Sequence, residues 1–327
     1  MADCIIITGG AGFIGSCFVK KAIDKAYKVV VLDKLTYAGN LKNLASVSKN
    51  PNYCFVKGDI CDSVIVRELL NKYNPTSIVN FAAESHVDNS ISGPAEFITT
   101  NINGTFNLLN LSLQYFKNLP ENHANKFRFI HISTDEVYGS LNYTDPAFSS
   151  STPYAPNSPY SASKASSDHL CRAWFETYQL PVIITNCSNN FGPFQHTEKL
   201  IPKIISNAIN GLEIPIYGNG KNIRDWIYVE DHVDGIFLAL QNGKSGKKYL
   251  FGGNNELRNI DVAYKICDIL EKKNNIAYRK QIKFVKDRPG HDFRYAIDNS
   301  EVSKELGFKP SYIFDTALEE TINWYIK

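Results

Sequence analysis

Tyr160 and Lys164 lie four residues apart in a segment that has the signals of a helix start. Ser158 is a good N-cap and Pro159 suits the first helical position, so we expect the helix to begin there. Residues four apart share one face of a helix. A nearby cation stabilises a phenolate, so Lys164 is expected to lower the pKa of Tyr160 and make it a base near neutral pH. Taken alone, the pattern is common by chance, and a pair on the protein surface would be the better explanation.

Three further reactive side chains follow the apolar segment 127–133, which we expect to be a strand. Thr134, Asp135 and Glu136 come next, and the carboxyl ends of parallel strands face the ligand crevice of an open sheet. Two adjacent carboxyl groups in such a place can differ in pKa, which leaves one protonated as an acid and one ionised as a base. Outside that context, an Asp that caps a turn beside an exposed Glu would explain the pair.

A glycine-rich turn after the first apolar segment indicates a dinucleotide site. Residues 4–7 are followed by Gly9, Gly12 and Gly15, and a helical pattern continues from there. Glycines allow the tight turn and let backbone N–H groups reach a pyrophosphate at the helix N-terminus. Asp33 ends the next apolar run, about 20 residues on, where its carboxylate can bind both ribose hydroxyls. Because that carboxylate would repel a 2′-phosphate, the sequence predicts NAD rather than NADP.

These groups need a scaffold in which strands alternate with helices. Apolar strand candidates cover 4–7, 28–32, 53–56, 77–81, 127–132 and 182–185, and the segments 13–26, 62–73, 95–116 and 160–179 are long enough for helices. Apolar strands that alternate with helices predict a parallel sheet covered on both faces. We therefore expect an α/β protein with a Rossmann-like, doubly wound parallel sheet.

The pattern changes after about residue 186, where turn signals become frequent. Helical patterns return at 199–210, 230–241, 261–273 and 314–326. We expect a smaller C-terminal α/β domain that binds substrate. The predicted domains are 1–186 plus about 222–252 for the cofactor, and 187–221 plus 253–327 for the substrate. The segment 140–158 is predicted to be a long loop.

Composition excludes several classes of protein. The chain has 327 residues, 43% hydrophobic and 21% charged, and its net charge is +2 (35 − 33), which is typical of a soluble enzyme-sized protein. No segment concentrates positive charge, so we expect no nucleic-acid partner and no membrane surface. No apolar run reaches the length of a membrane span, and residues 5–7 are too short for a signal peptide. Seven scattered cysteines without Cys-x-x-Cys predict reduced thiols, no metal site and a cytoplasmic protein.

The reactive residues occur within longer segments that resemble a known family. The segments that carry the resemblance are 33–40, 81–88, 133–139, 158–168, 186–190, 223–226 and 288–292, which are spread over nearly the whole chain. Together with the glycine-rich turn, they resemble the extended short-chain dehydrogenase/reductase family, and most closely its nucleoside-diphosphate-hexose 4,6-dehydratases. The segment Thr134–Gly139 is the most specific, because related sugar 4-epimerases lack the Asp-Glu pair.

The resemblance implies an NAD-dependent hydro-lyase that leaves the hexose on its nucleotide and regenerates its cofactor in each turnover. Tyr160 would take the proton from the C4 hydroxyl while C4 gives hydride to NAD. Thr134 would hydrogen-bond that oxygen, and Lys164 would hold the nicotinamide ribose. Glu136 would remove the C5 proton and Asp135 would protonate the departing C6 hydroxyl, before hydride returns to C6. The product would be a 4-keto-6-deoxy sugar nucleotide.

The resemblance also assigns binding residues. Cofactor contacts would come from Gly9, Gly12, Phe13, Ile14, Gly15, Asp33, Lys34, Asp59, Ile60, Ala82, Ala83, Thr100, Tyr160, Lys164 and Asn190. Substrate contacts would come from Ser85, Thr134, Asn189, Lys199, Leu200, Tyr217, Arg224, Asn259, Arg288 and Tyr295. An arginine suits a diphosphate because its guanidinium binds two oxygens at once. Asp59, or any single Asn or Arg among these, would also fit a turn cap or a surface ion pair.

The family's quaternary structure provides a further expectation. Its members pair two helices of each subunit across a twofold axis as a four-helix bundle. The segments 95–116 and 160–179 match those helices, so the resemblance implies a homodimer.

Departures from the family pattern leave the identity of the sugar nucleotide open. Residues 191–197 differ from the usual sequence, and Asn89 replaces a usual Arg. The substrates dTDP-glucose, UDP-glucose and UDP-N-acetylglucosamine all stay open, as does epimerisation at C5. A 4-epimerase or decarboxylase of the same superfamily is one alternative, which the Asp135–Glu136 pair disfavours. A non-catalytic NAD(H)-sensing module is another, but it would not need Thr134, Tyr160 and Lys164 together.

Overall fold

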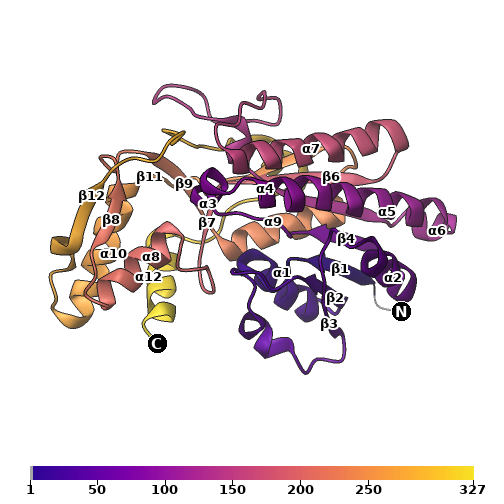
Figure 1. Ribbon diagram of the computed structural model, residues 1–327, viewed down its shortest axis with the longest axis horizontal. Coiled ribbons are helices and arrows are strands. Elements are labelled where there is room, and N and C mark those ends of the chain that lie inside the picture. Colours follow the sequence, from indigo (N-terminus) through magenta and orange to yellow (C-terminus); the bar gives the residue numbers. More distant parts are fainter. Residues whose placement is uncertain (1–2) are drawn as a thin grey trace.

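A computed structural model describes residues 3–327, whose centre is a seven-stranded parallel sheet (Figure 1). Its strand order is β10-β6-β5-β4-β1-β2-β3. The strands are β1 (Cys4–Thr8), β2 (Lys28–Asp33), β3 (Tyr53–Lys57), β4 (Ser77–Asn80), β5 (Arg128–Thr134), β6 (Val182–Cys187) and β10 (Lys248–Phe251). The strand order reverses between β1 and β4, the point at which such sheets bind ligands. The predicted fold class is confirmed.

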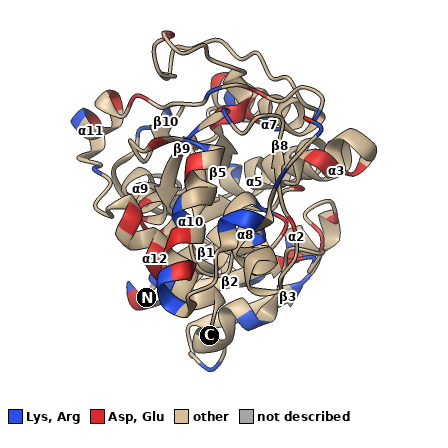
Figure 2. Cartoon of the chain, turned by 90° about the vertical axis from the view of Figure 1, so that its left-hand side faces the viewer, with Lys and Arg blue, Asp and Glu red and all other residues tan. Residues whose placement is uncertain are grey.

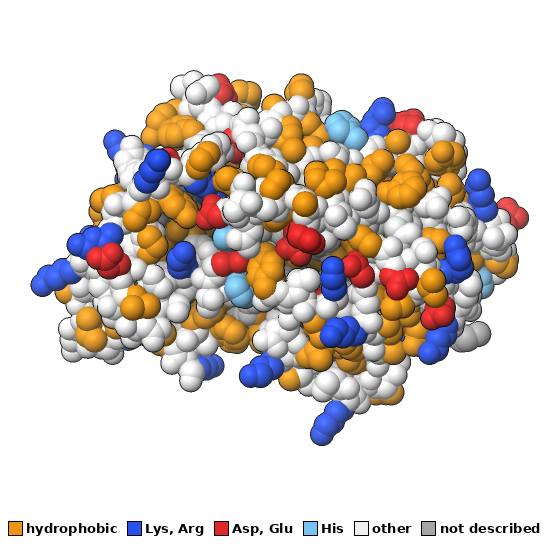
Figure 3. All heavy atoms as spheres, viewed as in Figure 1, with side chains coloured by type: hydrophobic (Ala, Val, Ile, Leu, Met, Phe, Trp, Pro, Cys, Tyr) orange, Lys and Arg blue, Asp and Glu red, His pale blue; other side chains and the backbone are white. Residues whose placement is uncertain are grey.

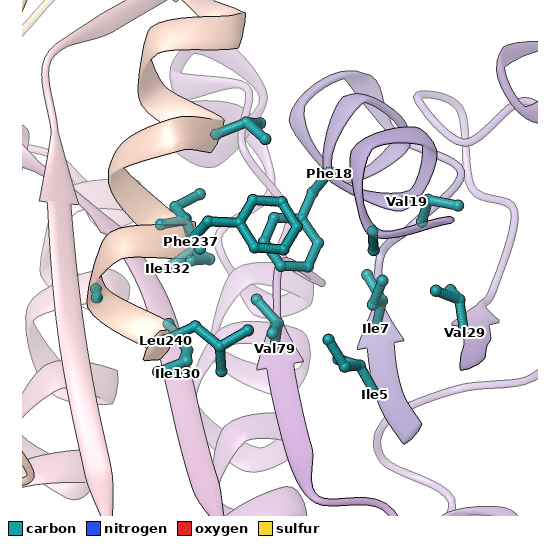
Figure 4. Packing of buried hydrophobic residues seen from close by; sticks show 14 of the residues in the cluster. Ile5, Ile7, Phe18, Val19, Val29, Val79, Ile130, Ile132, Phe237 and Leu240 are labelled. Carbon is teal, nitrogen blue, oxygen red and sulfur yellow. The ribbon is translucent and has the colours of Figure 1, made fainter. Parts of the chain in front are cut away.

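Helices cover both faces of this sheet. One face carries α1 (Phe13–Asp24), α9 (Val229–Asn242) and α11 (Ser300–Leu306), and the other carries α2 (Ser63–Tyr73), α5 (Thr105–Lys117) and α7 (Pro159–Tyr178). Strand β1 is buried along its length, and its alternate side chains contribute to the two cores: Ile5 and Ile7 to the first, Cys4 and Ile6 to the second. Between α1 and α9, the rings of Phe18 and Phe237 stack at 4.3 Å (Figure 4).

A smaller part of the chain has its own core. It contains a three-stranded sheet ordered β11-β9-β7 and a two-stranded sheet of β12 and β8. These strands are β7 (Asn189–Phe191), β8 (Ile214–Tyr217), β9 (Ile223–Tyr228), β11 (Glu256–Arg258) and β12 (Ile282–Val285), and they pack with α8 (Leu200–Ile209), α10 (Asn259–Asn274) and α12 (Phe314–Tyr325). In the view of Figure 2, acidic and basic residues are interspersed over the elements at this end of the molecule.

The remaining short helices connect these elements. They are η1 (Leu41–Val47), α3 (Val87–Ser92), α4 (Ala95–Phe97), η2 (Ile98–Gly104), α6 (Glu121–Ala124), η3 (Asp135–Tyr138) and η4 (Tyr278–Gln281). The expected helix over 95–116 is therefore not uniform, because a π-helical segment, η2, interrupts it. Such segments are frequent at functional sites, and Thr100 lies on this one.

The observed helix starts agree with the capping signals. Ser158 caps α7, accepting the N–H of Ser161, and Pro159 is the first helical residue. The expected helix over 13–26 ends two residues early, since Ala26 adopts a positive φ of 62°. No helix within residues 3–327 combines the length and apolar character that a membrane span requires.

The segment 222–252 is shared between the two sheets. Its strand β9 pairs with β7 and β11 in the smaller sheet, whereas α9 and β10 belong to the large one. The boundaries proposed from the sequence, 1–186 plus about 222–252 against 187–221 plus 253–327, stay a prediction.

Candidate active site

A cavity of about 290 Å³ lies at the carboxyl ends of the central strands. It is lined by most of the residues predicted to act on cofactor or substrate. These are Gly9, Gly12, Phe13, Ile14, Gly15, Asp33, Lys34, Asp59, Ile60, Ala82, Ala83, Ser85, Thr100, Thr134, Asp135, Glu136, Tyr160, Lys164, Asn189, Asn190 and Lys199. The predicted residues outside this lining are Leu200, Tyr217, Arg224, Asn259, Arg288 and Tyr295. In the view of Figure 3, acidic and histidine side chains gather near the middle of the face, between the two ends of the molecule.

In the glycine-rich turn between β1 and α1, Gly9 and Gly15 are too close to their surroundings to carry side chains. A Cβ on Gly15 would lie 2.3 Å from the carbonyl oxygen of Gly9, and one on Gly9 would lie 2.6 Å from the backbone nitrogen of Ala82. Gly12 is the N-cap of α1 and has no side chain to satisfy the first N–H groups, and the first turn holds no acidic residue. Those N–H groups suit an anionic group such as a pyrophosphate.

Asp33 is held at the end of β2 by the backbone. Its two carboxylate oxygens accept the N–H groups of Ala11 and Leu35, each at 2.8 Å. Burial raises its pKa, although these two hydrogen bonds act in the opposite direction. A carboxylate has about four acceptor sites, so the group keeps capacity for ribose hydroxyls. The residues present therefore fit the dinucleotide that the sequence predicts.

Asp59 lies in the same cavity and also closes its own loop. It accepts the N–H of Cys61 at 2.9 Å and forms an ion pair with Lys34 at 2.8 Å. Burial acts to raise the pKa of Asp59, but these two partners together lower it. Asp59 therefore caps its own loop and also lines the cavity.

The end of β5 places Thr134, Asp135 and Glu136 in the cavity. The Thr134 hydroxyl accepts the N–H of Glu136 at 3.2 Å and donates to Oδ1 of Asp135 at 3.3 Å. Asp135 is 1% exposed, and its Oδ2 has no hydrogen-bond partner among the described residues. Glu136 is half-buried. The two carboxyls are fixed by the 3₁₀ turn η3, for which Thr134 is the N-cap.

The two carboxyl groups have different electrostatic surroundings. Burial raises the pKa of Asp135 well above its ordinary value, and the carboxyls of Glu136 and Asp225 raise it further. Burial also raises the pKa of Glu136, but the cations of Arg288, Lys199 and Arg224 oppose that rise. Asp135 therefore favours the protonated form, whereas the cations near Glu136 favour its carboxylate. This difference is what a paired acid and base require.

Tyr160 and Lys164 are both buried, one helical turn apart on α7. The Lys164 ammonium donates to the carbonyl oxygen of Ile132 at 2.7 Å. Burial raises the pKa of Tyr160 well above its ordinary value, and the nearby carboxyls of Glu136 and Asp135 add to that rise. The pKa of Tyr160 in the protein alone is therefore raised, and not brought near neutral pH as the spacing from Lys164 predicted.

The predicted substrate residues join distant segments by side-chain contacts. Lys199 donates to the carbonyl of Ser85 at 2.7 Å. The Tyr217 hydroxyl donates to Asp88 at 2.8 Å, and Arg288 lies 3.7 Å from the same carboxylate. These contacts connect the segment after β4 with α8, β8 and the loop after β12.

The other predicted substrate residues differ in their surroundings. Arg224 is buried, donates to the carbonyl of Asp292 at 2.9 Å and stacks on the ring of Tyr295 at 4.2 Å. Asn189 and Asn259 each have a buried side-chain oxygen without a partner among the described residues. Leu200 begins α8 and its side chain packs against the smaller core, so only its backbone N–H is open to a polar role.

Several lining residues were not identified from the sequence. Glu84, His196 and Glu198 line the cavity, and Glu198 lies between His86 (4.0 Å) and His196 (3.6 Å). The signal that could have found Glu84 and Glu198 is their place directly before the predicted Ser85 and Lys199.

Asp168 is a further buried residue behind the site. It accepts from Ser133 and Tyr154 at 2.9 Å each and from Asn186 at 3.2 Å. It lies four residues after Lys164 on α7, and this helical spacing could have identified it.

Comparison with known proteins supports the same assignment. The family model described as GDP-mannose 4,6 dehydratase matches residues 6–321. The chain belongs to the GDP-mannose 4,6 dehydratase family. It is 52% identical over 333 residues to the dTDP-glucose 4,6-dehydratase of Salmonella typhimurium, covering 98% of this chain and 92% of that one. It is 51% identical over 329 residues to the dTDP-glucose 4,6-dehydratase of Haemophilus influenzae, covering 98% and 97%.

Solved structures of this dehydratase family have the same fold. The dTDP-glucose 4,6-dehydratase of Streptomyces venezuelae, solved with NAD and dTDP bound, superposes with a TM-score of 0.91 at 43% identity, covering 99% of this chain and 97% of that one. The Bacillus anthracis enzyme of the same name, solved in complex with NAD, gives 0.88 at 44% identity with the same coverage. These relatives support NAD as cofactor and NDP-hexose 4,6-dehydration as the reaction.

Proposed function

We propose that the protein is an NAD-dependent hydro-lyase that converts dTDP-glucose to its 4-keto-6-deoxy derivative. The observation that carries this proposal is the pair Asp135 and Glu136, two adjacent carboxyls in one cavity with Tyr160, of which Glu136 has more cations beside it. Elimination of water needs an acid and a base at the same substrate, and this pair supplies both. A 4-epimerase needs neither.

The first step of the proposed reaction is oxidation at C4. Tyr160 takes the proton of the C4 hydroxyl, and Thr134 hydrogen-bonds the same oxygen. Lys164 holds the nicotinamide ribose and keeps a positive charge near the phenol. Glu136 then removes the C5 proton, which the new ketone has made acidic, and Asp135 protonates the hydroxyl that leaves C6.

The dinucleotide would be held by residues of the turn after β1 and by Asp33. The N–H groups at the start of α1 suit its pyrophosphate, and Asp33 suits the adenosine ribose. Ala82, Ala83 and Thr100 line the wall beside it. When bound, NAD accepts hydride from the sugar and returns it within the same turnover.

The sugar nucleotide would lie on the other side of the cavity. Three cations lower the pKa of Glu136: Arg288, Lys199 and Arg224. A diphosphate can be bound by a few such cations and does not need a basic protein surface. Ser85, Asn189, Leu200, Tyr217, Asn259 and Tyr295 complete the proposed substrate set.

The test is incubation of the purified protein with dTDP-glucose, UDP-glucose and UDP-N-acetylglucosamine in separate reactions. We expect a 4-keto-6-deoxy product from dTDP-glucose, with retained configuration at C5, read by NMR at C4, C5 and C6. A 4-epimer without loss of water would contradict the dehydratase assignment. If the protein converts only a UDP-sugar and not dTDP-glucose, the proposed dehydration stands but the proposed nucleotide is wrong.

We also propose a homodimer in the cytoplasm. Ile98, Phe106 and Tyr178 are large apolar side chains exposed on η2, α5 and α7, the segments expected to form a four-helix bundle. Burial of such side chains against a second copy is favourable. Light scattering that gives the mass of a single chain at micromolar concentration would contradict the dimer.

A further inference from the structure

A buried polar pair, Asp168 and Asn186, lies behind the turn that carries the two carboxyls. Asp168 is 1% exposed and Asn186 is fully buried. Asp168 belongs to α7 and Asn186 to β6, and both of these elements contact β5. Neither residue is among those that line the catalytic cavity. The proposed reaction uses neither of them, so a role inferred for the pair rests on that proposed function.

Three hydrogen bonds converge on one oxygen of Asp168. Its Oδ2 accepts from the hydroxyls of Ser133 and Tyr154, each at 2.9 Å, and from the side-chain amide of Asn186 at 3.2 Å. The same amide nitrogen donates to the carbonyl oxygen of Thr134 at 3.0 Å. A side-chain amide has two N–H donors, so both are in use. Asp168 therefore holds the end of β5 directly at Ser133 and through one amide at Thr134.

The far end of the turn is bonded to the same pair. The Tyr138 hydroxyl donates to Oδ1 of Asn186 at 3.4 Å. Asp135 and Glu136 lie between this attachment and the one at residues 133–134. Hydrogen bonds within a 3₁₀ turn have poorer geometry than those of an α-helix. The position of the two carboxyls therefore depends on the attachments at both ends of the turn.

We propose that Asp168 is a positioning residue, whose hydrogen bonds hold the carboxyls of Asp135 and Glu136 in place against the substrate. Removal of its acceptor oxygen would leave the buried donors of Ser133 and Asn186 without this partner. The turn would then shift as these donors find other acceptors. A displacement of about 1 Å at reacting groups can lower a rate about 10²-fold.

The two chemical steps depend on this turn to different degrees. Elimination of water needs both carboxyls of the turn. Oxidation at C4 needs Tyr160, which lies on α7 close to its own N-cap, Ser158, and takes only the Thr134 hydroxyl from the turn. Loss of Asp168 should therefore slow elimination more than oxidation, and enzyme-bound NADH should accumulate.

The test uses the NAD-loaded enzyme, dTDP-glucose and two variants of Asp168. Asp168→Ala removes the acceptor oxygen, whereas Asp168→Asn removes the charge and keeps an oxygen for the same donors. We expect Asp168→Ala to lower kcat for the 4-keto product about 10²-fold at an unchanged KM, with a rise in NADH absorbance during turnover. Asp168→Asn should restore most of the lost kcat and abolish the accumulation of NADH.

Asp231→Ala is the matched control for the loss of a buried carboxylate. Asp231 lies on α9, is 3% exposed and does not line the cavity. It also accepts three hydrogen bonds, from the N–H and hydroxyl of Ser311 at 2.9 and 2.8 Å and from the N–H of Tyr312 at 3.1 Å. Asp231→Ala should lower the unfolding temperature as Asp168→Ala does, but keep the parent kcat per folded enzyme and accumulate no NADH.

A role of Asp168 through its charge predicts a different result. Burial lowers the pKa of Lys164, and the charge of Asp168 opposes that change. If this were its role, Asp168→Asn would be as impaired as Asp168→Ala, and oxidation at C4 would slow without accumulation of NADH. That pattern would overturn the positioning role, and so would an equal loss of kcat in Asp168→Ala and Asp231→Ala.

A second variant covers the case in which Asp168→Ala does not fold. Ser133→Ala removes one hydrogen bond to Asp168 next to Thr134 and leaves the carboxylate in place. It should also accumulate NADH, and a parent-like level of NADH in this variant would overturn the positioning role. A parent enzyme that forms no 4-keto product overturns the proposed function instead.

Discussion

The cofactor side and the sugar side of the cavity are built from different parts of the chain. On the cofactor side, backbone groups determine the shape: the turn with Gly9 and Gly15 leaves no room for a Cβ, and Asp33 is held by two backbone N–H groups. On the sugar side, side chains from distant segments meet, as Tyr217 and Arg288 do at Asp88. A backbone-built site is rigid, whereas a side-chain-built site can change its specificity by single substitutions.

The carboxyl pair lies between these two sides, and its substitution is expected to have the largest effect. Asp135→Asn and Glu136→Gln should each lower formation of the 4-keto-6-deoxy product about 10³-fold, since each removes one proton-transfer group. Oxidation at C4 should persist, because Tyr160 and the cofactor side are unchanged. Enzyme-bound NADH should therefore accumulate after dTDP-glucose is added, which absorbance at 340 nm measures.

Glu213→Gln, on an exposed glutamate, is the control for this prediction. It should turn over at the parent rate without accumulating NADH. Parent-like product formation in both carboxyl variants would show that the assigned roles are wrong.

Two glycine substitutions test whether the cofactor side depends on its backbone. In Gly15→Ala the new Cβ would meet the Gly9 carbonyl at 2.3 Å, so we expect a loss of about 1–3 kcal/mol in unfolding free energy and purification without NAD. In Gly307→Ala the new Cβ would have no atom within 4 Å, but residue 307 has a φ of 72°. Backbone strain alone should therefore lower the unfolding free energy by about 1–2 kcal/mol.

The two variants are matched in stability and differ in position. Thermal unfolding measures the loss of stability, and the NAD released on denaturation measures how much cofactor each variant binds. Gly307→Ala should retain its full NAD content. A full content of NAD in Gly15→Ala would break the contrast between the two sides.

The same contrast explains how much the sequence could predict. The turn from Gly9 to Gly15, the N-cap Ser158 and the strand-end carboxyls are local patterns, and the structure places each of them as expected. The Tyr217–Asp88 contact joins residues 129 positions apart, and no local pattern encodes it. The high pKa of Tyr160 was also missed, because it depends on burial by the whole fold and on Glu136 rather than on spacing along a helix.

A third prediction concerns stability rather than rate. The pKa of Asp135 is raised in the folded protein, so protonation of this residue favours folding. Its contribution to stability is complete below the pKa of an unfolded aspartate, about 3.9, and is lost as pH rises through the folded value. Asparagine does not ionise, so Asp135→Asn should unfold a few degrees above the parent at pH 8, and the difference should shrink towards pH 4. Thermal unfolding at several pH values measures this, and a difference that grows as pH falls would contradict it.

The smallest expected effect is on the sugar side. Tyr217→Phe removes the hydroxyl that donates to Asp88 and keeps the ring, which packs edge-on against His291. Loss of one hydrogen bond to a carboxylate costs about 1 kcal/mol, which corresponds to about a fivefold rise in KM for dTDP-glucose. The kcat and the affinity for NAD should not change, because the Tyr217–Asp88 contact involves none of the residues assigned to the cofactor or to the proton transfers. Tyr143→Phe, on a more exposed tyrosine, is the control and should leave KM unchanged. If Tyr217→Phe weakened NAD and sugar nucleotide equally, the two sides would be one coupled unit, and the difference between backbone-built and side-chain-built recognition would not hold for this molecule.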